Sequence, residues 1–365
     1  MKKQLIALSL FIIGAVPSYC QDTVAADKPK SLTFSGFLEA YYCYDFGEPA
    51  NNTRPDFVFA HNRHNEVNIN LAYLKSSYQK ERVRANIAIA AGTYMNATYA
   101  AEQGVLKMLY EATAGVKIAR NKDLYIDAGI MPSHLGFESA YSPDCQTLTR
   151  SIIADNSPYY ESGAKLNYRT DNDKWFLAVM VLNGWQRIQR VYGNSALSGG
   201  TQITYKPSSG IVLNYSTFAG NDKPDSNRQT RVFHNIYGTF ALSKKIGIIA
   251  GIDYGLEQKR PGSRYWNNWM GAAVIVRYQA GAKTAIAVRG EYYSDEHGVI
   301  ITSGTPNGFN ATGFSANFDF YLLKNVIWRI EVKTLKSTDR IFTDNTGAAT
   351  TANLLASTAL AITLK

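Results

Sequence analysis

Residues 325–336, NVIWRIEVKTLK, decide the fold of this chain. Apolar and polar side chains alternate along this stretch almost one by one. The apolar set is Val326, Trp328, Ile330 and Val332, and the opposing set includes Arg329, Glu331 and Lys333. A helix would repeat its apolar positions every three or four residues, so a period of two predicts a strand with one apolar and one polar face.

The same alternation recurs from Leu32 to Leu364. It predicts sixteen strands, at residues 32–46, 66–79, 82–94, 106–118, 123–132, 160–170, 173–185, 198–206, 209–219, 230–243, 245–258, 265–279, 282–294, 309–323, 325–336 and 353–364. Short turns alternate strictly with longer polar loops, and every proline after Pro17 falls in the leader, a loop, a turn or a strand end. These features are typical of an all-β fold, a transmembrane antiparallel up-and-down β-barrel of about 16 strands (14–18), closed because lipid leaves no partner for an open sheet edge.

Composition excludes several other classes of protein. The chain has 365 residues, a net charge of +9, 18% charged residues and 3 cysteines. Its apolar content is too high for disorder, and three cysteines are too few for a disulfide scaffold or a four-ligand zinc site. After residue 16 no apolar run approaches the roughly 18 residues of a membrane helix. The remaining alternative is a soluble β-sandwich, in which the apolar faces would meet in a core and tyrosines would not gather at strand ends.

The N-terminus carries a predicted export signal. Lys2 and Lys3 precede a short apolar run at 5–16, and small residues follow, so residues 1–20 are expected to be a secretory signal peptide. The alternative is a lipoprotein acylated on Cys20, although Tyr19 is bulky for such a site. Residues 21–30 are expected to form a polar periplasmic leader and residues 31–365 the barrel domain.

A barrel of this size encloses a lumen that side chains cannot fill, so we expect an aqueous channel. The polar face of the strands should form its wall. That face carries Glu39, Glu111, Lys117, Asp127, Glu161, Lys165, Arg169, Asp253, Glu257, Arg277, Arg289, Glu291, Asp319, Arg329, Glu331 and Lys333. Interleaved charges of both signs predict a hydrated wall without strong ion choice, and the small excess of Lys and Arg over the chain predicts a weak anion preference.

The third outer loop, residues 133–159, is the longest, and long loops in compact domains are usually functional. We expect it to fold inward and narrow the pore, with Glu138, Asp144, Arg150 and Asp155 facing charged wall residues; the alternative is an outward surface loop. Without Cys20, the remaining cysteines are Cys43 and Cys145. In the oxidising periplasm they could form a disulfide that fastens the loop across the lumen, or remain two free thiols.

Other chemistry finds little support. His61-x-x-His64 followed by Glu66 resembles metal-ligand spacing, but it lies in a polar loop where histidine pairs are common. His234 lacks the serine partner of a barrel hydrolase, and dinucleotide, phosphate-loop and zinc-protease motifs are absent. Basic charge is spread over alternating strands and does not cluster, so nucleic-acid binding is not expected. We predict no catalysis, no metal and no cofactor.

Four motifs carry a family resemblance. They are Ser35-Gly36-Phe37 to Tyr41-Tyr42, Asn62-Arg63-His64-Asn65-Glu66, Gly129 to Gly136-Phe137-Glu138, and Ser157-Pro158-Tyr159-Tyr160-Glu161-Ser162-Gly163. With them the chain resembles the OmpL-like β-barrel porins of Gram-negative outer membranes over essentially residues 31–365, most strongly before residue 190. The resemblance implies passive diffusion of small hydrophilic solutes. The chain departs from many outer-membrane barrels in ending on Leu364-Lys365 and not on an aromatic residue, which affects the expected assembly signal.

We therefore expect an outer-membrane porin, exported by a Sec-type route into a Gram-negative outer membrane. Its expected partners are membrane lipid, lipopolysaccharide and small hydrophilic solutes, and a homotrimer is compatible with its size. One alternative is a solute-specific, sugar-type channel that uses Phe37, Tyr41 and Tyr125 as a stacking track. The other is a structural barrel with a blocked lumen.

Overall fold

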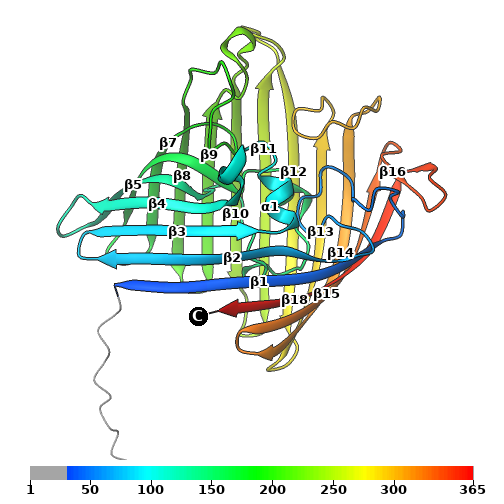
Figure 1. The fold of residues 1–365 in the computed structure, drawn as a ribbon, viewed down its shortest axis with the longest axis horizontal. Helices are drawn as coiled ribbons and strands as arrows, with labels where there is room; N and C mark the ends of the chain where they lie inside the picture. Colours follow the sequence, from blue (N-terminus) through cyan, green and yellow to red (C-terminus); the bar gives the residue numbers. More distant parts are fainter. Residues whose placement is uncertain (1–30, 365) are drawn as a thin grey trace, which may run out of the picture. The chain divides into compact units, whose positions relative to one another are not determined.

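The computed structural model describes residues 31–364, which form a closed antiparallel barrel (Figure 1). The predicted signal peptide and leader lie outside the described residues. The barrel strands are β1 (Leu32–Asp45), β2 (Val67–Lys80), β3 (Val83–Ala91), β4 (Leu109–Lys117), β5 (Asp123–Pro132), β6 (Tyr160–Arg169), β7 (Trp175–Leu182), β8 (Ser198–Ser208), β9 (Ile211–Gly220), β10 (Arg231–Ala241), β11 (Ile246–Gln258), β12 (Trp266–Gln279), β13 (Thr284–Asp295), β14 (Phe309–Leu323), β15 (Val326–Ser337) and β18 (Ala352–Leu364).

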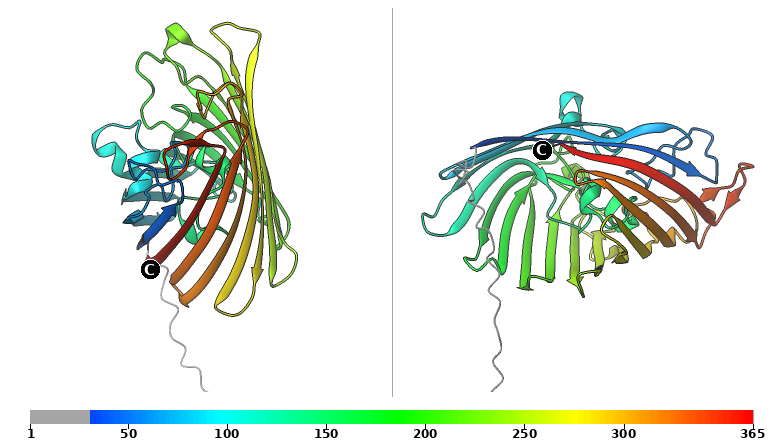
Figure 2. Two further views of the ribbon diagram at one scale, coloured as in Figure 1. Left: turned by 90° about the vertical axis from the view of Figure 1, so that its right-hand side faces the viewer. Right: turned by 90° about the horizontal axis from the view of Figure 1, so that it is seen from below.

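Each barrel strand pairs with its neighbours in the sequence, and β18 pairs with both β15 and β1, which closes the ring (Figure 2). The predicted sixteen-stranded up-and-down barrel is thus confirmed. The remaining elements lie in the loops: α1 (Thr93–Thr98), α2 (Ile152–Asp155), three short 3-10 helices at Gly104–Met108, Ser142–Asp144 and Asp225–Asn227, and the small hairpin of β16 (Phe342–Thr343) and β17 (Ala349–Thr350). Among residues 31–364, no helix is both long enough and apolar enough to cross a membrane.

Strand ends differ from prediction mainly around the second outer loop. The segment predicted as strand to residue 94 ends at Ala91, because Gly92 turns the chain at a φ of 135° and α1 follows. A Cβ at this glycine would lie 2.3 Å from the carbonyl oxygen of Asn70, so only glycine fits the turn. Similarly, the strand predicted from residue 106 begins at Leu109, after a 3-10 helix.

The register assigns the two faces. Residues directly opposite each other in an antiparallel pair point to the same side, and Asp319 pairs with Arg329 and Asn317 with Glu331 on the inner side. The apolar side chains of β15 point outward: Trp328 is 41% exposed and Val332 is 47% exposed. In a water-soluble sandwich such residues would be covered, so their exposure around the whole ring fits a surface that contacts lipid.

The connections alternate in length. Short turns such as 81–82 and 324–325 close one end of the barrel, whereas the longer loops 46–66, 133–159, 296–308 and 338–351 lie at the other. The longest of these loops, 133–159, determines which part of the inner wall is covered.

Candidate functional site

The inner wall of the barrel is polar, as predicted. Lysine and arginine side chains from one strand pair with acids on a neighbour or the next strand but one. Examples are Arg84 with Asp127 (Nη2 to Oδ2, 2.5 Å) and Arg277 with Asp319 (Nη1 to Oδ2, 2.7 Å). Such pairs keep charged groups satisfied on a surface that water reaches only in part.

Loop 133–159 contacts the inner wall, and Arg289 of β13 is at the centre of that contact. Its guanidinium donates to Thr147 Oγ1 (2.7 Å), to Thr149 O (2.6 Å) and to Thr149 Oγ1 (3.0 Å), all on the loop. It also donates to Glu331 Oε1 of β15 (3.1 Å), while Glu331 Oε2 accepts from the backbone N–H of Thr149 (2.5 Å). Arg289 and Glu331 are fully buried as a result.

Two further wall pairs bind the backbone of the loop. Arg329 donates to Asp319 and also to the carbonyls of Ser142 (2.6 Å) and Cys145 (3.0 Å). Glu291 accepts from Ile152 N–H (2.7 Å) and pairs with Lys333, which donates to the carbonyl of Arg150 (3.1 Å). The loop is therefore held on β13–β15 by charged wall residues that bind main-chain groups.

Within the loop, Arg150 acts as an internal clamp. Its guanidinium donates to the carbonyls of Leu148 (2.5 Å), Ser139 (2.7 Å) and Ala140 (3.1 Å), and its side chain is buried. Glu138 Oε2 accepts from the backbone N–H of Ser151 (3.0 Å), just before α2. These contacts give the loop one defined shape without regular secondary structure over most of its length.

The beginning of the loop is fixed on the opposite strands. His134 Nδ1 lies 2.8 Å from Glu161 Oε2, and its Nε2 lies 2.8 Å from the carbonyl oxygen of Thr217 on β9. Burial disfavours the charged imidazole, but the Glu161 carboxylate outweighs it and raises the pKa of His134. Wall glycines make room for the loop: a Cβ at Gly200 would lie 2.8 Å from the His134 ring, and one at Gly251 would lie 2.4 Å from the Phe137 ring.

The four predicted loop residues have different surroundings. Glu138 approaches Arg289 (Oε1 to Nη1, 3.8 Å), whereas Arg150 binds carbonyls of its own loop. Asp144 is exposed. Asp155 is 7% exposed and its Oδ1 has no hydrogen-bond partner among the described residues, so burial raises its pKa from 3.8 to about 6.

The seven residues predicted to line the lumen differ in how far other protein groups cover them. Lys165 is half-buried, and the other six are buried: Glu39, Asp253, Arg289, Glu291, Arg329 and Glu331. Glu39 is covered because Ser142 Oγ and Asn70 Nδ2 donate to its carboxylate and His61 Nε2 lies 2.8 Å from it. These six were expected to line a hydrated wall, but in the structure other protein groups cover them.

The predicted disulfide is not present. Cys43 and Cys145 are both buried free thiols. The Cys145 thiol donates to the carbonyl of Ser139 (3.3 Å), and Arg329 and Arg150 bind the carbonyls of Cys145 and Ser139. Cys43 packs with Tyr41, Leu148 and Leu355. Ion pairs and hydrogen bonds, and not a disulfide, fasten the loop.

The proposed aromatic stacking track is also covered. Phe37, Tyr41 and Tyr125 are 2%, 2% and 6% exposed. The Tyr141 ring lies edge-on to Phe37, with centroids 4.6 Å apart, and the Arg84 guanidinium lies 3.7 Å from the centroid of Tyr125. A solute in the lumen cannot stack on these rings in this arrangement.

Water instead reaches the wall of β2–β6, on the side away from β13–β15. The bases there are more exposed than the acids they contact: Lys75 is 28% exposed against 8% for Glu111, and Arg84 is 31% exposed against 9% for Asp127. Lys117, Lys165 and Arg169 on the same side are half-buried. The accessible part of the wall therefore presents mainly positive charge.

The family model described as "Putative beta-barrel porin-2, OmpL-like" matches residues 31–364. The chain belongs to this porin family. Among curated proteins, none matches the chain. The family resemblance drawn from the four motifs is thus confirmed, and the chain is a porin-type barrel of the outer membrane.

Solved structures share the fold at low sequence identity. The anion-selective porin from Comamonas acidovorans has a TM-score of 0.61 at 7% identity, covering 92% of this chain and 99% of that one. Salmonella typhi OmpF, in complex with daunomycin, has a TM-score of 0.60 at 10% identity, covering 91% and 97%. The trimer form of Vibrio cholerae OmpT has a TM-score of 0.55 at 9% identity, covering 91% and 98%. At these identities the likeness concerns the fold alone.

Proposed function

We propose that this porin is a passive channel for small hydrophilic solutes with a preference for anions, and that it has no catalytic activity. The observation that carries the preference is the exposure difference on β2–β6, where Lys75 and Arg84 are about three times as exposed as the acids they contact. A permeating ion meets the exposed member of each pair first. Positive charge at a water-filled wall raises the local concentration of anions.

We further propose that loop 133–159 is the constriction. Because Arg289, Arg329 and Lys333 hold the loop on β13–β15, and His134 contacts Thr217 of β9, the remaining path runs along the accessible wall of β2–β6. Deleting residues 138–155 should raise the single-channel conductance and weaken the anion preference, because the path would then include the mixed charges of β13–β15. Unchanged conductance in a correctly folded deletion variant would disprove the constriction.

The ion preference is tested in planar bilayers with a KCl gradient. Purified mature protein should give a reversal potential of the sign that favours chloride. Lys117→Gln and Lys165→Gln should each shift it toward zero, because neither lysine makes an ion pair among the described residues and both face the lumen. Lys122→Gln is the matched control, since Lys122 lies in a short turn and pairs with Asp171. A cation-favouring potential in the unaltered protein would overturn the proposal.

Two other properties belong to the proposal. Assembly as a homotrimer is supported by the fold shared with a porin described in a trimer form, and cross-linking in mild detergent tests it. The absence of any conductance from folded protein would favour the alternative of a structural barrel with a blocked lumen. We also propose contact with membrane lipid, which the outward apolar face supports, and with lipopolysaccharide; co-purification tests both.

A further inference from the structure

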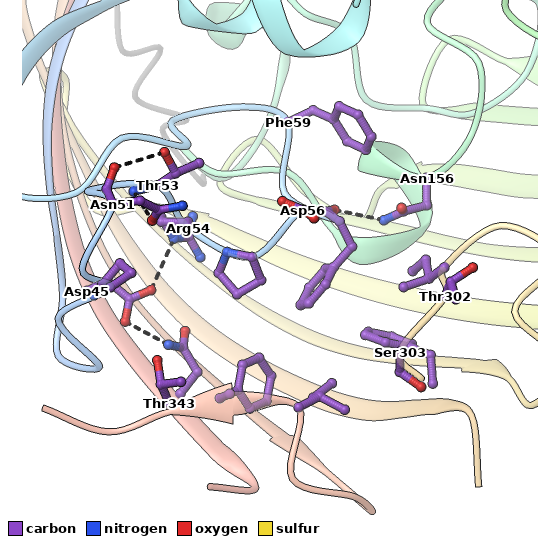
Figure 3. Close-up of a pocket in the computed structure, with 18 of the residues that line it drawn as sticks. Asp45, Asn51, Thr53, Arg54, Asp56, Phe59, Asn156, Thr302, Ser303 and Thr343 are labelled. Atoms are coloured by element: carbon purple, nitrogen blue, oxygen red, sulfur yellow. Dashed lines mark hydrogen bonds and ion pairs between the residues drawn. The ribbon is translucent and has the colours of Figure 1, made fainter. Parts of the chain in front are cut away.

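A cavity of about 410 Å³ lies among the outer loops, apart from the wall of β2–β6 (Figure 3). Loop 46–66 supplies one side with Arg54 and Phe57, and loops 296–308 and 338–351 supply the other with Thr302 and Phe342. The cavity size falls within the range of about 300–1,000 Å³ that is typical of small-molecule sites.

Three buried polar atoms at this cavity, Arg54 Nε, Asp45 Oδ2 and Asn353 Oδ1, make no hydrogen bond to any described residue. Arg54 is 2% exposed, and its Nε makes no hydrogen bond to any described residue, although it forms an ion pair with Asp45 (Nε to Oδ2, 3.5 Å). Asp45 Oδ1 accepts from Asn353 Nδ2 (2.7 Å) and Gly47 N–H (2.9 Å), which leaves Asp45 Oδ2 and Asn353 Oδ1 without donors. An unpartnered buried polar group costs about 1–3 kcal/mol, so a ligand that partners these atoms would bind favourably.

The chemistry of these groups selects the ligand. Arg54 offers a fork of N–H donors, whereas Asp45 and Asn353 offer acceptors within a few ångströms of it. A ligand must therefore accept and donate at neighbouring atoms, as vicinal hydroxyl groups do. A simple anion would meet Asp45, and a simple cation would meet Arg54, so both are disfavoured.

The rest of the lining fits the same class. Uncharged amide and hydroxyl side chains, including Asn156, Thr302 and Thr343, surround the cavity, and Figure 3 shows them on several sides of it. Phe57, Phe309 and Phe342 add apolar surface, with the Phe57 and Phe309 ring centroids 4.8 Å apart. Aromatic surface beside hydrogen-bonding groups suits a ring that has both C–H and hydroxyl faces.

We propose that this cavity binds a neutral mono- or disaccharide at the outer mouth of the barrel. The inference goes beyond ion preference, because it assigns a capture site in the outer loops and not in the channel. Binding does not require conduction, so its failure and the failure of the proposed channel are separate results.

The test is isothermal titration of the folded full-length mature barrel in detergent. Glucose, galactose, maltose and cellobiose are the sugar probes, and acetate and ethanolamine are the charged probes. At least one sugar should give saturable heat. Thr302→Trp, which places a large side chain in the cavity from an exposed loop position, should weaken that sugar by roughly tenfold or more, the loss expected for one or two hydrogen bonds.

Matched variants keep the test decisive. Thr338→Trp changes an exposed residue that does not line the cavity, and should bind as the unaltered protein does. Arg54→Lys keeps the positive charge beside Asp45 but removes the forked N–H donors of the guanidinium, so it should weaken sugar binding several-fold. Heat-modifiable migration on a gel confirms that this variant still folds as a barrel. Glu296→Gln, at an exposed position of loop 296–308 that does not line the cavity, should leave sugar binding unchanged. No heat with any sugar, equal binding by the two tryptophan variants, or a response to acetate or ethanolamine alone would overturn the proposal.

Discussion

Replacing Arg289 by methionine tests whether the charged wall holds the loop. Arg289 makes three hydrogen bonds to Thr147 and Thr149 and one to Glu331, and all these groups are buried. Removing one partner of a buried ion pair costs about 3–5 kcal/mol, because the other charge remains unpaired. At 1.4 kcal/mol per factor of ten, docking of the loop should weaken by about two to three and a half powers of ten.

The assay combines urea unfolding in detergent with single-channel recording. Arg289→Met should lower the stability by the stated amount and produce larger, noisier conductance as the loop leaves the wall. Arg277→Met is the matched control: Arg277 donates only one hydrogen bond to the loop, to Gln146 O at 3.3 Å, and its partner Asp319 keeps Arg329. A cost of about 1 kcal/mol and normal conductance are expected for it.

A double variant separates the charge effect from a size effect. Arg289→Met with Glu331→Gln removes the unpaired carboxylate while the amide oxygen can still accept from Thr149 N–H. It should be more stable than Arg289→Met alone, although two residues have changed. If Arg289→Met and Arg277→Met behave alike, or if the double variant is the least stable of all, the reasoning about the charged anchor is refuted.

Two substitutions and one thiol titration test the contacts of the same loop. Gly271→Leu should destabilise the barrel by about 1–3 kcal/mol in urea unfolding, because a Cβ there would lie 2.3 Å from Ile153 Cγ2; an unaffected barrel would contradict the close packing. Asp155 has a folded pKa raised to about 6, so the folded state binds the extra proton and stability should fall as the pH rises from about 4 to 6. Asp155→Asn should abolish that fall and stabilise the protein at pH 7 by up to about 3 kcal/mol; an unchanged pH profile would refute the assignment. Thiol titration of denatured mature protein should find Cys43 and Cys145 both free, with little reaction before unfolding, since both are buried and burial raises the pKa of the Cys145 thiol; finding no free thiol would restore the disulfide.

The barrel could be predicted from the sequence because its signal is local. Alternation with a period of two needs only neighbouring residues, and lipid on one side and polar groups on the other impose it on every strand. The errors occur where that condition ends. At Gly92 the chain leaves the sheet for α1, and Tyr94 and Met95 of that helix are buried in an apolar cluster with Leu71 instead of facing lipid.

Of the two alternatives left open for Cys43 and Cys145, a disulfide or two free thiols, the structure shows the free thiols for a related reason. Two cysteines in an oxidising compartment satisfy the count for a disulfide, but the path of the loop decides their separation. That path depends on Arg329, which binds the carbonyls of Ser142 and Cys145 from a strand nearly 190 residues away in the sequence. No spacing pattern encodes such a contact.

Because these contacts are long-range, the sequence alone does not distinguish wall residues that face water from wall residues that the loop covers. Arginine and glutamate at inward positions suit either role: they hydrate a wall, and they also bind the main chain of a docked loop. Glycine at an inward position is different, because it offers nothing to water and serves only to admit another group. Gly251 and Gly271 face Phe137 and Ile153 of the loop. Inward glycines are therefore only a partial sequence signal for the covered wall, because Gly115 on β4 accommodates the Asp127 side chain and not the loop.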